Sequence, residues 1–168
     1  MSLSMHQSSI AVFARALRNL RHVLQQGEAW AKSHNVSDAV LLQTRLIPDM
    51  FPLVKQVQIA CDTAARSAAR LANAEAKSFP DNEATLVDLY ARIDGTIAYI
   101  ESFKPTQIDG AETRTITLPR HSGDVKLSGE AYLHEYALPN FFFHCTTAYA
   151  LLRRAGTQIG KSDFLGKI

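Results

Sequence analysis

Apolar residues recur at helical spacing in four separate stretches of this 168-residue chain. Side chains three and four positions apart lie on one face of an α-helix, so each stretch predicts an amphipathic helix with one buried face. The stretches run over about residues 4–32, 48–72, 85–104 and 128–155. They leave little of the chain for a sheet. The pattern therefore predicts an all-α fold, a four-helix bundle.

Residues with strong positional preferences mark the ends of these helices. Thr85 and Asp88 have the spacing of a capping box, which predicts the start of the third helix. Ser128 is suited to cap the fourth helix, and Gly156 stands where helices commonly end on a glycine. Proline is favoured in a first helical turn, so we expect the second helix to begin at Pro48.

The spacing of apolar residues changes from a helical period to strict alternation between the third and fourth helices. Ile116 and Leu118 precede the residues HSGD, and Val125 and Leu127 follow them. Alternating apolar residues on both sides of a turn are typical of a β-hairpin. We therefore expect one small hairpin between helices three and four.

Length and charge limit the class of protein. A chain of this size buries an ordinary core, and we expect residues 1–168 to form a single domain. The 18 basic residues nearly balance the 16 acidic ones, and no basic run is interleaved with aromatic residues. Nucleic acid is therefore not an expected partner.

The cysteines and the chain start favour a cytoplasmic protein. Cys61 and Cys145 both fall in apolar helical stretches, where a free cysteine behaves as a small hydrophobic residue. The first residues lack the layout of a secretory signal, and no segment reaches the ~20 uninterrupted apolar residues that cross a bilayer. We expect no membrane association.

The fourth helix contains the unusual run ALPNFFFH. Proline in a helix interior removes a hydrogen-bond donor and costs ~3 kcal/mol or more, so Pro139 predicts a bend. The bend lets Phe141 and its neighbours fill the core, or it redirects Asn140 and His144, which lie four residues apart on one face, or it does both. The same aromatic run is also compatible with an apolar ligand pocket or a dimer interface.

The second helix offers polar residues opposite this run. Gln58 and Asp62 are four residues apart and border the apolar face, so their polar ends are within reach of the space between helices. A charged Asp62 in that space would need a partner. We therefore expect an interhelical pocket that includes Asp62, Pro139 and Phe141.

Several segments resemble one known group of proteins. RLIPDMFPLVKQVQIACD (45–62) and ALPNFFFHCTTAYALLR (137–153) are similar to stretches of the DinB/YfiT-like superfamily, in its uncharacterised domain-of-unknown-function branch. The segments SMHQSSIAVFARALRNL, RTITLP and GKSDFLG extend the resemblance over nearly the whole chain. The resemblance implies a four-helix bundle with a long crossover connection, commonly found as a homodimer.

The resemblance also implies positions for a metal. In the wider superfamily, three histidines bind a divalent ion, one from helix two and two from helix four at an H-x-x-x-H spacing. The corresponding positions here are Gln58, Asn140 and His144, so one of the three is histidine. A carboxamide oxygen is a weaker ligand than imidazole for transition metals. The metal centre is thus expected to be altered or vestigial, and the metal itself is left open.

The sequence is compatible with three functions. The first is a cytoplasmic, dimeric bundle that binds a small molecule in the interhelical cleft, with or without catalysis. The second is a metal-dependent transferase or hydrolase, because some relatives of this kind are thiol-dependent transferases or maleylpyruvate isomerase-like enzymes. The third is a non-catalytic structural or interaction module, in which Pro139 and the phenylalanines serve packing alone.

Overall fold

Four long helices form the body of the molecule, as predicted. The computed structural model describes residues 4–119 and 121–167. The long helices are α1 (Val12–Ser33), α3 (Leu53–Ala72), α4 (Leu86–Glu101) and α7 (Leu138–Ala155). The shorter elements are η1 (Gln7–Ala11), α2 (Asp38–Leu42), α5 (Pro105–Ile108), β1 (Thr115–Leu118), β2 (Val125–Ser128), α6 (Gly129–Ala131), η2 (Tyr132–Ala137) and α8 (Lys161–Leu165).

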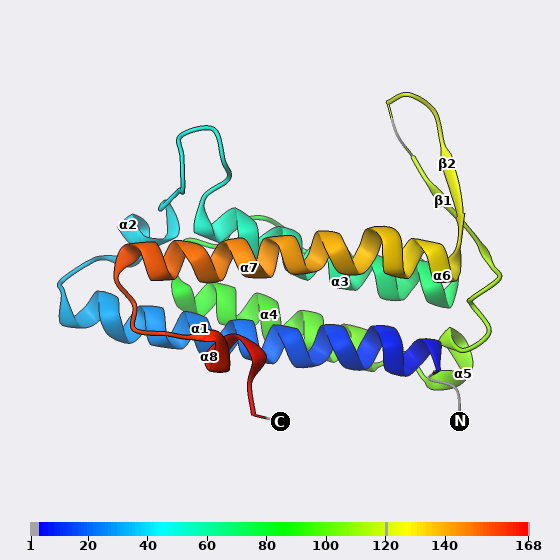
Figure 1. The fold of residues 1–168 in the computed structure, drawn as a ribbon, viewed down its shortest axis with the longest axis horizontal. Helices are drawn as coiled ribbons and strands as arrows, with labels where there is room; N and C mark the ends of the chain where they lie inside the picture. Colours follow the sequence, from blue (N-terminus) through cyan, green and yellow to red (C-terminus); the bar gives the residue numbers. More distant parts are fainter. Residues whose placement is uncertain (1–3, 120, 168) are drawn as a thin grey trace.

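The helices run in pairs rather than in simple alternation. Figure 1 shows α1 and α7 running in one direction along the bundle and α3 and α4 running in the other. Since α3 and α4 follow one another in the chain and point the same way, residues 73–85 must return along the bundle between them. Helix α3 packs against both α7 and α4, and α1 packs against α4. The 73–85 segment is therefore the long crossover connection.

The predicted helix ends follow from local side-chain chemistry. The Thr85 hydroxyl accepts the Asp88 N–H at 3.2 Å, and the Asp88 carboxylate accepts the Thr85 N–H at 2.8 Å. This reciprocal pair is the predicted capping box. The Ser128 hydroxyl caps the start of the fourth helix, and Gly156 ends it at φ 118°, in the left-handed region.

The start predicted for the second helix is wrong. Helix α3 begins at Leu53, directly after Pro52, and Pro48 lies in the preceding turn. The residue before a proline is disfavoured in helical conformation. A helix that began at Pro48 would have to carry Phe51, the residue before Pro52, in that conformation, so the helix starts beyond the second proline.

The predicted hairpin is present, and one of its strands faces the core. Strands β1 and β2 pair antiparallel, with Ile116 opposite Leu127 and Leu118 opposite Val125. Ile116 and Leu118 are buried, whereas Val125 is 42% exposed. Figure 1 shows the hairpin projecting at the end of the bundle where α6 begins.

The helical path around Pro139 changes its hydrogen-bonding register. The residues just before α7 form the π-helical turns of η2, and Pro139 then takes the second position of α7. A wider turn accommodates a residue that cannot donate to the carbonyl four positions earlier. Of the three phenylalanines that follow, Phe141 is fully buried against Phe13, with ring centroids 5.0 Å apart, and Phe143 is 56% exposed.

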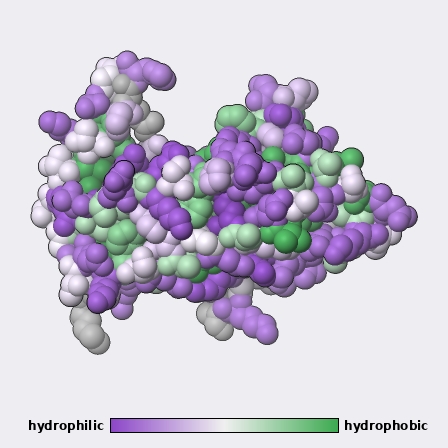
Figure 2. Space-filling view, turned by 180° about the vertical axis from the view of Figure 1, so that it is seen from behind, coloured by the Kyte–Doolittle hydropathy of each residue, from purple (hydrophilic) through white to green (hydrophobic). Residues whose placement is uncertain are grey.

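The surface is mostly polar. Figure 2 shows the molecule from behind, where hydrophilic residues cover most of the face and hydrophobic ones occur in scattered patches. No helix in the described residues combines the length and the apolar composition needed to cross a membrane. The apolar faces of the helices are turned inward, where Leu17, Ile93 and Phe141 are fully buried.

Candidate functional site

A row of polar contacts joins α3 to the helix formed by η2 and α7. Side chains at 56, 63 and 67 lie on one face of α3, since steps of seven and four return to the same side of a helix. The contacts are His144 Nδ1 with Gln56 Oε1 (2.7 Å), Asn140 Nδ2 with Thr63 Oγ1 (3.1 Å), and Tyr132 Oη with Ser67 Oγ (2.9 Å). Asn140 and His144 thus both reach α3, from one face of α7.

The first of these contacts fixes the tautomer of His144. Gln56 Nε2 donates to the Phe51 carbonyl at 3.1 Å, so the Gln56 oxygen is the atom that faces His144. A carboxamide oxygen only accepts, and His144 therefore carries its proton on Nδ1. Burial lowers the pKa of His144, which favours the neutral ring. Nε2 of His144 is then the nitrogen with the free lone pair.

Gln58 makes a different connection from the one expected. Its Nε2 donates to Glu83 Oε2 at 2.7 Å, in the crossover segment. The carboxamide of α3 that meets His144 is Gln56, two residues earlier. Two residues correspond to about 200° around a helix, so Gln56 and Gln58 point in very different directions. The structure thus brings Asn140 and His144 onto the α3 contact row and directs Gln58 to the crossover.

Glu83 belongs to a buried ion-pair network around Arg92. The Arg92 side chain is 1% exposed and forms salt bridges with Asp62 (2.6 Å), Glu83 (2.8 Å) and Asp81 (3.0 Å). It also donates to the Pro80 carbonyl, whereas its buried Nε has no acceptor among the described residues. This network ties the crossover segment to α3 and α4. It provides the partner that Asp62 was expected to need.

Arg92 was not predicted as a buried residue, although the sequence carries a signal for it. Leu89, Arg92, Ile93 and Thr96 follow helical spacing, and Arg92 therefore stands on the apolar face of its helix. A charged residue on such a face needs buried partners of opposite charge. The acidic partners come from α3 and from an irregular segment, and no periodicity in the sequence links them.

A polar cleft opens along the α3 contact row, beside the end of strand β1. Its volume is about 330 Å³. Most of its walls come from α3 and η2, and Leu118 and Pro119 of the hairpin form its edge. The lining residues are Ile59, Asp62, Thr63, Arg66, Ser67, Arg70, Leu118, Pro119, Tyr132, Tyr136 and Asn140.

The charges in this polar cleft do not cancel. Asp62 receives both Arg66 (3.1 Å) and Arg92 (2.6 Å), so its charge is already matched. Arg70 donates to the Tyr132 hydroxyl at 3.2 Å, and no carboxylate pairs with Arg70 within the part of the chain that the structure describes. A guanidinium held by a neutral hydroxyl keeps its charge available to an anion.

The residues predicted for the pocket separate into two groups. Asp62 lines the polar cleft, together with Asn140, which was predicted as a metal position. Pro139 is exposed, Phe141 is in the core, and neither of them lines the cleft. Over residues 4–119 and 121–167, no three His, Cys, Asp or Glu side chains gather as they would around a metal ion. The set Gln58, Asn140 and His144 stays a prediction.

Both cysteines are buried in the apolar interior. Burial raises the pKa of the Cys61 thiol to about 12 and also raises the pKa of Cys145. A thiol reacts as a nucleophile in its ionised form. Neither side chain therefore has the environment of a catalytic cysteine, although Cys145 follows His144 directly in the chain.

Comparisons with known proteins agree with this architecture. No curated protein matches the chain. A crystal structure of a DinB family member protein from Shewanella denitrificans superimposes with a TM-score of 0.92 at 39% identity, over 97% of this chain and 92% of that one. The family model described as "Domain of unknown function (DUF1993)" matches residues 5–165. The chain therefore belongs to the DUF1993 family and has the helical bundle fold of a DinB family member.

Proposed function

We propose that this protein binds a small anionic molecule in the polar cleft between α3 and η2, without the three-histidine metal centre implied by the superfamily resemblance. The observation that carries the proposal is the pairing of Arg70 with the Tyr132 hydroxyl rather than with a carboxylate. The buried Tyr132 hydroxyl also contacts Ser67, so the group that orients Arg70 is fixed before a ligand arrives. Fixed donors reduce the entropy lost on binding.

The lining chemistry favours a carboxylate or a phosphate. Arg66 and Arg70 supply planar guanidinium groups, which suit the oxygens of such anions. The hydroxyl of Thr63 and the amide of Asn140 lie in the same cleft. The volume of about 330 Å³ is at the lower end of the range for small-molecule sites, which favours a compact metabolite.

Calorimetric titration with inorganic phosphate and with succinate tests this proposal. We expect the wild type to bind at least one of these anions and Arg70→Gln to lose that binding while keeping its helical circular dichroism. Arg154→Gln is the matched control, since Arg154 is exposed on α7 and does not line the cleft. Binding of equal strength in the Arg70 variant, or none in the wild type at millimolar anion, would contradict the proposal.

A second candidate function rests on the orientation of His144. Metal-binding histidines commonly donate their other ring N–H to an oxygen acceptor, and His144 Nδ1 donates in this way to Gln56. Nε2 of His144 and the oxygens of Asn140 and Gln58 would then be the atoms offered to a divalent ion, as in a metal-dependent transferase or hydrolase. Against it, Gln58 lies in the Arg92 network, where a fixed cation is already present.

Elemental analysis separates the two candidates. Protein purified without a polyhistidine tag is expected to contain less than about a tenth of an equivalent of transition metal if the three-residue set binds weakly. A stoichiometric metal that is lost in His144→Ala would favour the second candidate. The expected homodimer and cytoplasmic location stay predictions, and sedimentation analysis of the purified protein would check the first of them.

A further inference from the structure

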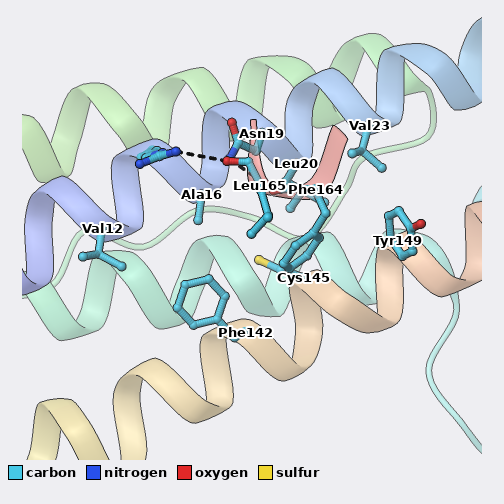
Figure 3. Close-up of a pocket in the computed structure, with 11 residues that line it drawn as sticks. Val12, Ala16, Asn19, Leu20, Val23, Phe142, Cys145, Tyr149, Phe164 and Leu165 are labelled. Atoms are coloured by element: carbon cyan, nitrogen blue, oxygen red, sulfur yellow. Dashed lines mark hydrogen bonds between the residues drawn. The ribbon is translucent and has the colours of Figure 1, made fainter. Parts of the chain in front are cut away.

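A second, apolar pocket lies between α1, α7 and the C-terminal segment. Figure 3 shows side chains from all three elements surrounding one space. The volume is about 380 Å³, and the residues that shape its interior include Val12, Ala16, Leu20, Phe142, Tyr149 and Phe164. This apolar pocket shares no lining residue with the polar cleft. It is large enough for a small ligand with an apolar body.

The outer wall of the apolar pocket is the segment that contains α8. Arg15 donates to the carbonyls of Leu165 (3.2 Å) and Lys167 (3.4 Å), and Asn19 donates to the carbonyls of Phe164 (3.2 Å) and Leu165 (2.9 Å). These contacts fasten the segment to α1 along its backbone. The side chains of Phe164 and Leu165 are thereby placed over the space (Figure 3).

One lining residue carries a charge. Arg15 is exposed at the edge of the apolar pocket, and its described hydrogen bonds go to neutral carbonyl oxygens. No acidic residue lines the pocket. Among residues 4–119 and 121–167 no carboxylate pairs with the Arg15 guanidinium. An apolar interior with such a guanidinium at its edge matches a molecule that has an apolar body and one anionic end.

We propose that the apolar pocket binds a carboxylate with a short alkyl or aryl body. The body lies between the side chains of α1 and the aromatic rings of Phe142, Tyr149 and Phe164, and the carboxylate meets Arg15 at the edge. The burial of apolar surface supplies most of the affinity. The charge pair at the exposed edge sets the orientation and the preference for an acid.

Calorimetric titration with octanoate and with octanol tests this proposal. Ala16 is half-buried and lines the pocket, so Ala16→Phe is expected to fill the space and weaken octanoate binding by at least about tenfold. Ala98→Phe, at an exposed position on α4, is the matched control and should bind like the wild type. Failure of the wild type to bind octanoate, or equal binding by Ala16→Phe, would overturn the proposal.

Arg15→Gln tests the charged end without touching the core. Arg15 also fastens the terminal segment, so its loss weakens both ligands to the same extent through the wall. Because exposed ion pairs are worth up to about 1 kcal/mol, we expect octanoate to lose about fivefold more affinity than octanol. Arg18→Gln, one turn along α1 and outside the pocket, should change neither. An equal loss for both ligands, or none for octanoate, would overturn the assignment of the carboxylate to Arg15. Arg70→Gln must leave octanoate binding unchanged, which separates this site from the polar cleft.

Discussion

The polar cleft and the apolar pocket are built from the same bundle but are held in opposite ways. The cleft wall is fixed by contacts inside the protein. Tyr132 is 1% exposed and hydrogen-bonded to Ser67, and Asp62 forms a salt bridge with the buried Arg92. The pocket wall is fixed from outside, by contacts of Arg15 and Asn19 with the backbone of a short terminal segment. Internal contacts open only with the whole fold, whereas surface contacts open locally. We therefore expect the cleft to be a rigid site and the pocket to have one movable wall.

The largest effect is expected from Arg92→Met. Removing the guanidinium leaves Glu83, Asp62 and Asp81 without their shared partner, and breaking a buried ion pair on one side costs about 3–5 kcal/mol. Denaturant unfolding followed by circular dichroism would measure this loss. Arg18→Met is the control, because its pair with Glu101 is exposed and should matter by less than about 1 kcal/mol. A loss as small as the control's would show that the cleft is not held from inside.

An intermediate effect is expected from Gly129→Ala, at the junction of the hairpin and α6. An added Cβ would overlap the backbone carbonyl of Ala111, so the chain must shift, at a cost of about 1–3 kcal/mol. The shift should disturb the Leu118 and Pro119 edge and weaken anion binding in the cleft without changing octanoate binding. Thermal unfolding and the two titrations would measure these effects.

Gly95→Ala is the control for that change. Its added Cβ would lie 3.6 Å from the Phe79 ring, an ordinary contact, and alanine is the better helix former by about 1 kcal/mol. We expect unchanged or raised stability. If both glycine variants lost the same stability, steric overlap at the hairpin junction would not be the cause.

A smaller effect is expected from Tyr132→Phe. The change removes the hydroxyl that meets Ser67 and Arg70, and leaving a buried polar group without its partner costs about 1–2 kcal/mol. The freed Arg70 should also lose its fixed orientation and bind the anion more weakly. Chemical denaturation and anion titration would measure both. The comparison is Tyr149→Phe, at a half-buried residue that lines the other site.

The smallest effect on global stability is expected from Asn19→Ala. Its amide fastens the terminal segment through the carbonyls of Phe164 and Leu165, and a change at such a site is usually worth less than about 0.5 kcal/mol. Hydrogen exchange should nevertheless become faster in residues 161–167 and stay unchanged in α3. Equal protection of the segment in both proteins would remove the distinction between an internally and an externally held site.

Patterns among neighbouring residues predicted the helices, but they did not predict the contacts of the candidate site. Thr85 with Asp88 and Gly156 identified helix ends because a cap depends on residues three or four apart. The spacing of four residues likewise predicted that Asn140 and His144 lie on one face of their helix. The sequence did not show which carboxamide of α3 contacts His144. Gln56 and Gln58 have the same side chain, and the rotation of the helix about its axis decides which of them faces His144. Packing of α3 between α7 and α4 decides that rotation.

The sequence by itself determined four amphipathic helices, the caps of the third and fourth of them, and a hairpin, since each depends on the chemistry of neighbouring residues. Tertiary structure alone decided that Arg92 gathers three acidic side chains, that Arg70 meets Tyr132 instead of a carboxylate, and that the terminal segment covers an apolar space. These contacts join residues far apart in the chain. Their existence depends on how whole helices are rotated and stacked, and no local pattern carries that information.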